Sequence, residues 1–165
     1  MTSRVTVRPA VVADGDALGR LGALLVAEHY EFDPKRFIAP IANLAERYGS
    51  FLISQSERPE MLVLVAERDG EVVGYAFGGM EGNDYMALRG PAGALYDLVV
   101  SPEHRRQRIG TQLLDAALAA LAGLGAPRVV LFTAEKNDGA QRMFEQAGFR
   151  RTMIEMTREL TARSD

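Results

Sequence analysis

The stretch over residues 94–121, ALYDLVVSPEHRRQRIGTQLLDAALAAL, constrains the fold more than any other part of this 165-residue chain. Its apolar run from Leu95 to Val100 is rich in residues that favour strands, and Pro102 ends the run because proline cannot donate to a central ladder. A basic turn and an apolar helical pattern follow. The sequence therefore predicts a buried strand that leads through a tight turn into a helix.

The turn between this strand and this helix is typical of an anion-binding site. The first N–H groups of a helix have no intrahelical acceptor, and the positive end of the helix dipole lies beside them. Arg105, Arg106 and Arg108 add charged donors at the same place. We therefore expect a phosphate-bearing small molecule to bind here.

Charge and composition limit the classes of function. The net formal charge is −3, so the arginines form a local patch, and we expect no nucleic-acid partner. The chain has no cysteine and only two dispersed histidines, which excludes a disulfide scaffold and a thiolate nucleophile and predicts no metal site. Neither a signal-peptide pattern nor an apolar run of transmembrane length is present, so we expect a cytoplasmic protein that does not enter a membrane.

The remaining patterns predict a single α+β domain over residues 1–160 with a tail over 161–165. Asp14 or Asp16 is expected to cap the first helix. The expected elements are a strand over 4–8, a helix to residue 28, a helix over 34–48, an undecided piece over 51–54, a strand over 61–66, a turn at Asp69-Gly70, a strand over 72–77, a polar loop over 81–93, the strand and helix described above, a strand over 128–133, a helix over 137–147 and a long strand over 149–160.

This order of elements resembles the GCN5-related N-acetyltransferase (GNAT) family, and so do two local motifs. Residues 105–110 match the family's turn of pattern Gln/Arg-x-x-Gly-x-Gly/Ala, apart from one position. The resemblance implies a three-layer α/β arrangement, with a mixed and mostly antiparallel sheet that is flanked by helices and splayed between its fourth and fifth strands. The second family signature is matched by Asn137, Ala140, Phe144, Gly148 and Phe149.

The resemblance also implies acetyl-CoA as cosubstrate, with no metal. In the family, the pantetheine arm pairs with the fourth strand, the phosphates bind at the basic turn, and an asparagine contacts the arm. Carried over to this chain, the expected contacts with acetyl-CoA come from Leu98, Val99, Val100, Arg105, Arg106, Gln107, Arg108, Ile109, Gly110, Thr111, Asn137, Ala140 and Phe144.

Two positions depart from the family pattern. Arg108 replaces the first motif glycine, and we expect it to keep right-handed dihedrals, because a left-handed residue with a side chain costs about 1–2 kcal/mol. Phe144 stands where many relatives have a tyrosine that protonates the departing thiolate. A thiol with a pKa of about 8.5 leaves tolerably well without an acid, and Tyr96, Tyr85 or a water could supply one. Packing in the helix's apolar face is the other interpretation of Phe144.

Asp97 and Tyr96 are the candidate catalytic residues. Acetyl transfer needs a neutral amine, so a base must take a proton from the substrate ammonium. Asp97 interrupts an otherwise apolar strand, where burial would raise its pKa and make it a better base. A structural hydrogen bond to a neighbouring loop is the alternative for this carboxylate.

The acceptor is expected between the N-terminal helices and the 81–93 loop. Glu28, His29, Glu81 and Asp84 could attract a cation there, although each also fits a helix cap or a solvated surface residue. The sequence thus predicts direct acetyl transfer from acetyl-CoA to a primary amine of a small molecule. Protein N-termini or lysines, and a catalytically weak acyl-CoA-binding relative, are the alternatives, and a homodimer is left open.

Overall fold

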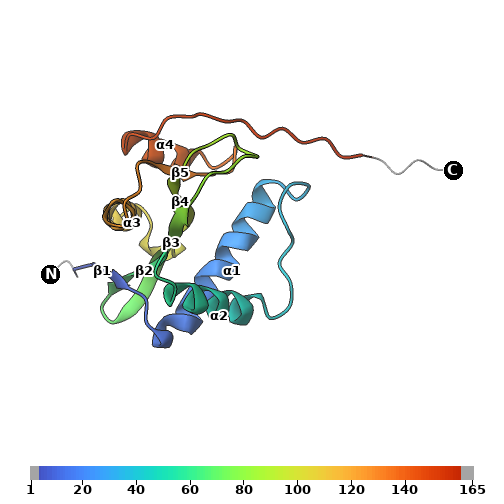
Figure 1. The fold of residues 1–165 in the computed structure, drawn as a ribbon. Coiled ribbons are helices and arrows are strands. Elements are labelled where there is room, and N and C mark those ends of the chain that lie inside the picture. The colour runs from blue at the N-terminus through green and yellow to red at the C-terminus, as the bar shows by residue number, and fades with distance from the viewer. Residues whose placement is uncertain (1–3, 161–165) are drawn as a thin grey trace.

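The computed structural model describes residues 4–160 and contains one five-stranded sheet in the order β1-β2-β3-β4-β5 (Figure 1). Neighbouring strands are antiparallel except for the parallel pair β4–β5, as the family resemblance implied. Residues 1–3 and the expected tail over 161–165 lie outside the described part. The strands are β1 (Thr6–Pro9), β2 (Met61–Arg68), β3 (Glu71–Glu81), β4 (Ala92–Val100) and β5 (Val129–Leu131).

Helices cover both faces of the sheet, which gives the expected three layers. Helices α1 (Gly15–Phe32) and α2 (Leu44–Ser56) lie on one side, and α3 (Ile109–Gly123) and α4 (Asp138–Gln146) on the other (Figure 1). The short 3-10 turns η1 (Val12–Asp14) and η2 (Pro102–His104) precede α1 and α3.

Each face of the sheet has its own apolar core. Period-2 alternation along the strands directs successive side chains to opposite faces. The core under α1 and α2 contains Leu18, Leu21, Leu52, Val63, Val65, Tyr75, Phe77 and Val99. The core under α3 and α4 contains Leu62, Ala66, Val73, Ala76, Leu95, Ile109, Leu113, Leu114, Ala117, Leu121 and Phe144.

The prediction of a helix over 34–48 is wrong. The second helix begins only at Leu44, after a non-helical segment that contains Pro40 and a left-handed Asn43 (φ 59°). It continues through Gly49, where a break was expected, and includes the undecided piece over 51–54. A Cβ at Gly49 would lie 2.3 Å from the carbonyl oxygen of Gly15, so this glycine permits close contact between the two helices rather than ending one.

The predicted strand over 149–160 is also wrong. These residues form no regular element, residues 150–160 are exposed, and the segment leads away from α4 and beyond the body of the domain (Figure 1). A strand requires a ladder partner, and within residues 4–160 the outer edge of the three-residue β5 pairs with nothing. The alternating sequence alone therefore does not make this segment a strand.

The pairing of β4 changes on both sides near Tyr96. Phe77 pairs with Asp97 while Gly78 pairs with Leu95, so Tyr96 is the extra residue of a β-bulge. On the other side, β5 pairs only with residues 93–95 of β4. The expected splay between the fourth and fifth strands is therefore confirmed, and it begins where the bulge lies.

A buried ion pair joins β1 to the start of α1. Arg8 donates from Nη1 to Oδ2 of Asp14 at 2.8 Å and from Nη2 to Oδ1 at 3.0 Å, and the Val11 N–H donates to the same carboxylate at 2.8 Å. Asp14 thus holds the N-cap position, as one of the two expected residues, but its side chain binds Arg8 and Val11 instead of a helix N–H. The hydrogen bond from Arg8 holds the pKa of Asp14 below its usual range, although burial opposes this.

We predict that Asp14→Asn lowers the free energy of unfolding at neutral pH by about 1–2 kcal/mol, because it removes a charged acceptor from Arg8. Because the folded-state pKa of Asp14 is depressed, its contribution is complete above the unfolded pKa of about 3.9 and is lost as the pH falls through the folded value. Urea titrations of both proteins at pH 7 and pH 3 measure this. If the two proteins differed in their free energy of unfolding by the same amount at both pH values, the contribution of the ionised Asp14 carboxylate to stability would be contradicted.

Candidate active site

The basic turn before α3 is built on two left-handed arginines. Arg106 has φ 59°, and Arg108, the N-cap of α3, has φ 64°. The expectation that Arg108 keeps right-handed dihedrals is therefore wrong, because the chain must reverse from η2 into α3 within a few residues. Each such residue costs about 1–2 kcal/mol, so the turn holds backbone strain of the kind that clusters at binding sites.

This backbone geometry fits an anion. Left-handed residues within a turn direct successive N–H groups inward and create a concave cluster of donors. In α3 the Gln112 N–H donates to the Arg108 carbonyl at 3.0 Å, so the N–H groups of residues 109–111 precede the first helical bond and remain open. A Cβ at Gly110 would lie 3.3 Å from Sδ of Met143, a tight contact that would require this flexible side chain to shift slightly.

The side chains of the turn divide into two groups. Arg105 donates from Nε to the Val100 carbonyl at 2.9 Å and from Nη2 to Glu28 at 2.6 Å, so it ties the turn to β4 and to α1. Gln107 accepts from Arg68 and donates to the Glu103 carbonyl at 3.2 Å. The guanidinium groups of Arg106 and Arg108 have no hydrogen-bond or ion-pair partner within residues 4–160, so these two are available for a ligand.

The residues expected along the pantetheine arm line the open side of the splay. The β4 segment over residues 98–100 has no strand partner on its β5 side within the described chain. Val99 is buried under α1 and α2, while Leu98 and Val100 pack partly against the opposite core. Asn137 caps α4, where its Oδ1 accepts from the Ala140 N–H at 3.1 Å.

Phe144 is buried in the α3 core. Its ring lies edge-on to Phe149, with centroids 5.8 Å apart, and Ala140 packs partly against the same cluster. The structure thus places this side chain where the packing interpretation requires it. Without a hydroxyl, it supplies no proton at the site.

Asp97 lies under α1 and α2 with only 9% of its surface exposed. Tyr48 of α2 and Tyr75 of β3 donate to its Oδ2, at 2.7 and 2.9 Å. No group within residues 4–160 donates to Oδ1. Burial raises the pKa of Asp97, while the two phenol hydrogen bonds and the nearby His29 lower it in part. The result is a buried carboxylate with one oxygen available and a pKa that favours accepting a proton.

The sequence did not indicate the two tyrosines that hold Asp97. Tyr48 is 49 residues away from Asp97 in sequence, and no motif links them. Period-2 alternation in β3 does place Tyr75 and Phe77 on one face, which was an available signal for Tyr75. The carboxylate also raises the pKa of both phenols, after burial, which is the largest cause.

Tyr96 protrudes from the bulge next to Asp97. Its hydroxyl donates to Oε1 of Glu81 at 2.7 Å, and its ring lies 5.0 Å from that of Phe77. Burial, followed by the bond to Glu81, raises the pKa of Tyr96 to about 12. The phenol therefore keeps its proton throughout the neutral range.

The expected acceptor residues are paired rather than free. Glu28 binds Arg105, Glu81 binds Arg89 and Tyr96, and Asp84 lies 3.7 Å from Arg89. Asp84 also accepts from the N–H groups of Met86 and Ala87 at 3.0 Å, which lowers its pKa. His29 contacts the Leu25 carbonyl through Nδ1 at 2.8 Å and lies edge-on to two phenylalanine rings, Phe32 and Phe37.

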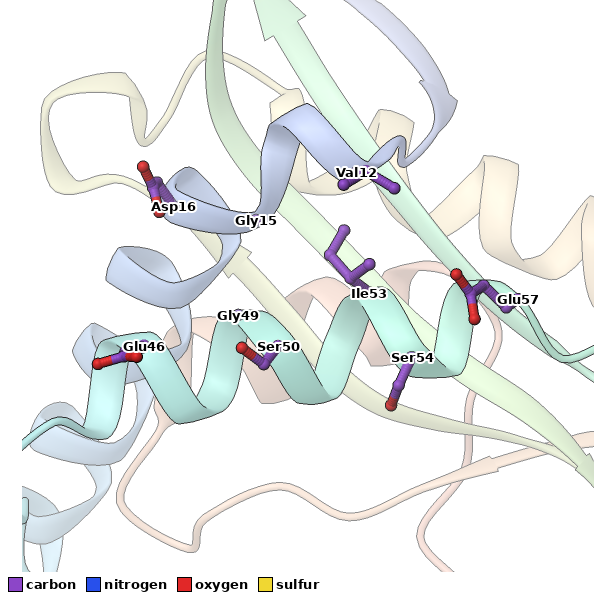
Figure 2. Close-up of a pocket in the computed structure, with 9 residues that line it drawn as sticks. All are labelled: Val12, Gly15, Asp16, Glu46, Gly49, Ser50, Ile53, Ser54 and Glu57. Atoms are coloured by element: carbon purple, nitrogen blue, oxygen red, sulfur yellow. The ribbon is translucent and has the colours of Figure 1, made fainter.

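A shallow surface pocket of about 390 Å³ lies elsewhere, where η1 and the start of α1 cross α2 (Figure 2). Val12 and Ile53 face each other within it, and Asp16, Glu46 and Glu57 are at its borders. It contains none of the residues expected to act on acetyl-CoA or on an acceptor.

Residues 4–160 contain neither a cluster of metal-ligating side chains nor a helix that could span a membrane. No three His, Asp or Glu side chains gather there in a way that could hold a metal ion. Among the helices of this described part, none has the length and apolar character needed to cross a membrane.

Comparison with known proteins identifies the family. Residues 21–149 match the model of the acetyltransferase (GNAT) family. The chain belongs to the GNAT acetyltransferases. Mycothiol acetyltransferase of Thermobispora bispora is 35% identical over 96 residues, which are 56% of this chain but 31% of that protein. The chain thus spans less than a third of this curated relative.

Solved structures agree with this membership at the level of the fold. A mutant of the BH1408 protein from Bacillus halodurans matches with a TM-score of 0.79 and 19% identity, covering 94% of this chain and 99% of that one. The aminoglycoside N-acetyltransferase AAC(6′)-Iy, solved in complex with CoA, matches with a TM-score of 0.72 and 15% identity, covering 98% of both chains.

We predict that Arg108→Gly stabilises this GNAT domain by about 0.5–1 kcal/mol. Removing left-handed strain gains about 1–2 kcal/mol, and the greater freedom of glycine in the unfolded chain offsets about 0.4–1 kcal/mol. The free energy of unfolding in urea measures the change. The matched control is Gln107→Gly in the same turn, which we expect to lose stability because residue 107 is not left-handed. A lower free energy of unfolding in Arg108→Gly would contradict this prediction and would mean that the arginine side chain stabilises the fold by more than its backbone strain costs.

Proposed function

We propose that this protein is an N-acetyltransferase that moves the acetyl group of acetyl-CoA directly to a primary amine of a small molecule. The observation that carries the proposal is Asp97, a buried carboxylate with one available oxygen, next to the bulge where β4 and β5 part. The anion-binding geometry of the turn over 105–111 supports a phosphate-bearing cosubstrate at the other end of the same strand.

The basic turn and the open edge of β4 would hold acetyl-CoA. The phosphates would meet the N–H groups of residues 109–111 and the free guanidinium groups of Arg106 and Arg108. The pantetheine amides would find backbone groups along residues 98–100 that no strand within residues 4–160 pairs with on the β5 side, apart from the Val100 carbonyl, which accepts from Arg105. Asn137, the N-cap of α4, and Ala140 would contact the same arm. When bound there, acetyl-CoA supplies an activated acetyl group and a thiol leaving group.

Asp97 would act as the base. An ammonium group at the site gives its proton to the carboxylate, and the neutral amine then attacks the acetyl carbon. The N–C bond forms, the C–S bond breaks, and the second proton on the nitrogen neutralises the leaving thiolate directly or through a water. Tyr96 remains a candidate relay for this proton: its phenol, which is protonated at neutral pH, would give its own proton to the thiolate and take up the one that leaves the nitrogen.

A cytoplasmic location and self-association complete the proposal. The absence of cysteine supports the location. The exposed C-terminal segment over 150–160 and the unpaired outer edge of β5 support a homodimer, since each could satisfy the other in a second copy. The large apolar side chains that the segment over 150–160 exposes are Met153, Ile154, Met156 and Leu160.

We predict that Asp97→Asn lowers kcat by about 10²-fold or more, because the amide cannot accept the ammonium proton. The affinity for acetyl-CoA, read from thermal shift, should stay within a factor of about three, since the substitution preserves the shape of the side chain. In the unsubstituted protein, kcat/KM should fall as the pH drops through the pKa of Asp97, and this acid limb should be absent in the variant. Unchanged turnover in Asp97→Asn would exclude Asp97 as the base.

We predict that the full chain elutes at twice its chain mass in size-exclusion chromatography with light scattering. A chain that ends after Phe149 should elute as a monomer, because it lacks the segment with the exposed apolar side chains. Circular dichroism and thermal unfolding of the shortened chain check that the domain still folds. A full chain that is monomeric at millimolar concentration would contradict the homodimer.

A further inference from the structure

A continuous row of four aromatic rings lies beside Asp97 and extends from α2 to the bulge of β4. It begins at Tyr48, whose hydroxyl holds the carboxylate at 2.7 Å. The ring centroids of Tyr48 and Phe51 are 6.3 Å apart, those of Phe51 and Phe77 are 5.7 Å apart, and those of Phe77 and Tyr96 are 5.0 Å apart. We call these four residues the aromatic row.

Two rings of the aromatic row are exposed although they border a buried group. Phe51 is 46% exposed and Tyr96 is 41% exposed, while Phe77 between them is 6% exposed. The four rings come from α2, β3 and β4, so the tertiary structure rather than a local pattern brings them together. Exposed aromatic surface that converges on a single buried carboxylate is typical of a ligand site rather than of a solvated face.

The charges around the aromatic row indicate how many cationic groups the ligand carries. Arg105 pairs with Glu28, and Arg89 pairs with Glu81 and lies 3.7 Å from Asp84. Farther out, Arg36 pairs with Glu155. Each carboxylate expected to attract a cation thus already has an arginine, which cancels most of its field. Asp97 differs from Glu28, Glu81 and Asp84 because phenols and not a cation hold it, so it is the carboxylate among these four that can best take a substrate nitrogen.

We propose that the acceptor is a primary monoamine with an apolar, ring-bearing body, of the arylalkylamine class. Its nitrogen lies at Asp97 and its ring lies on Phe51, Phe77 and Tyr96. A polycation such as a polyamine or an aminoglycoside would bring further ammonium groups to an apolar surface that has no free carboxylate for them, and their lost hydration would go unreplaced. This inference rests on the proposed acetyltransferase function and adds the substrate class to it.

The test measures thiol release from acetyl-CoA with four acceptors: 2-phenylethylamine, n-propylamine, spermidine and the aminoglycoside kanamycin. We expect kcat/KM for 2-phenylethylamine to exceed that for n-propylamine by about 10–100-fold, since burial of the extra ring carries the difference. Spermidine and kanamycin should be poorer still. Equal or better turnover of either polycation would overturn the substrate class and leave the acetyltransferase function intact. If none of the four acceptors, and no other amine tested, caused thiol release, both the substrate class and the acetyltransferase function would be overturned.

Variants of the aromatic row then separate recognition from chemistry. Phe51→Ala should raise KM for 2-phenylethylamine about 10-fold while changing n-propylamine kinetics by less than about threefold. Tyr96→Ala should show the same pattern when it is compared with Tyr96→Phe, which also lacks the hydroxyl. Tyr96→Phe keeps the ring and should keep the preference, and a fall in its kcat of about 10²-fold for every amine would identify the hydroxyl as the proton donor. Leu124→Ala, which removes an apolar side chain of similar exposure (43%) at the end of α3, on the other face of the sheet, is the matched control. Ring deletions that affect all amines equally would overturn the proposal.

Discussion

The end of the β4–β5 ladder at Leu95 is the constraint on which the site depends. From the next residue onward, β4 keeps its partner on the β3 side but has none on the β5 side within the described chain. The bulge at Tyr96 occurs at the same point and reverses which side chains face which layer. As a consequence, one strand presents the Asp97 carboxylate to the α1–α2 layer and a backbone edge without a strand partner in the described chain to the splay, and the proposed acetyl transfer uses both.

The hydrogen bonds around Asp97 leave one oxygen of its carboxylate without a donor within residues 4–160. Tyr48 and Tyr75 satisfy only one oxygen of Asp97, and both are neutral donors. The carboxylates nearer the surface are instead paired with arginines, as in Arg105–Glu28, which also joins the basic turn to α1. Burial raises the pKa of Asp97, and the hydrogen bonds from the two neutral phenols lower it only in part.

The basic turn before α3 holds backbone strain at Arg106 and Arg108. Two arginines adopt left-handed dihedrals that glycine would adopt freely, and the surrounding structure holds them there. Both guanidinium groups are without a partner within residues 4–160, in the same turn as the open N–H groups of residues 109–111. Arg108 thus departs from the family motif and adds charge to this left-handed turn.

The sequence by itself determined the elements whose signals are local. The strand–turn–helix unit, the Asp69-Gly70 hairpin with both residues left-handed, and the Asn137 cap all follow from residue types at short spacing. The tertiary structure decided what depends on partners far away in sequence. Gly49 lies inside a helix, where it permits the close approach of Gly15, and residues 150–160 form no strand because no edge within residues 4–160 pairs with them. Asp97 becomes a base candidate because Tyr48 and Tyr75 hydrogen-bond one of its oxygens. Local patterns set backbone preference, but burial and long-range hydrogen bonds set which preference is realised and which group can react.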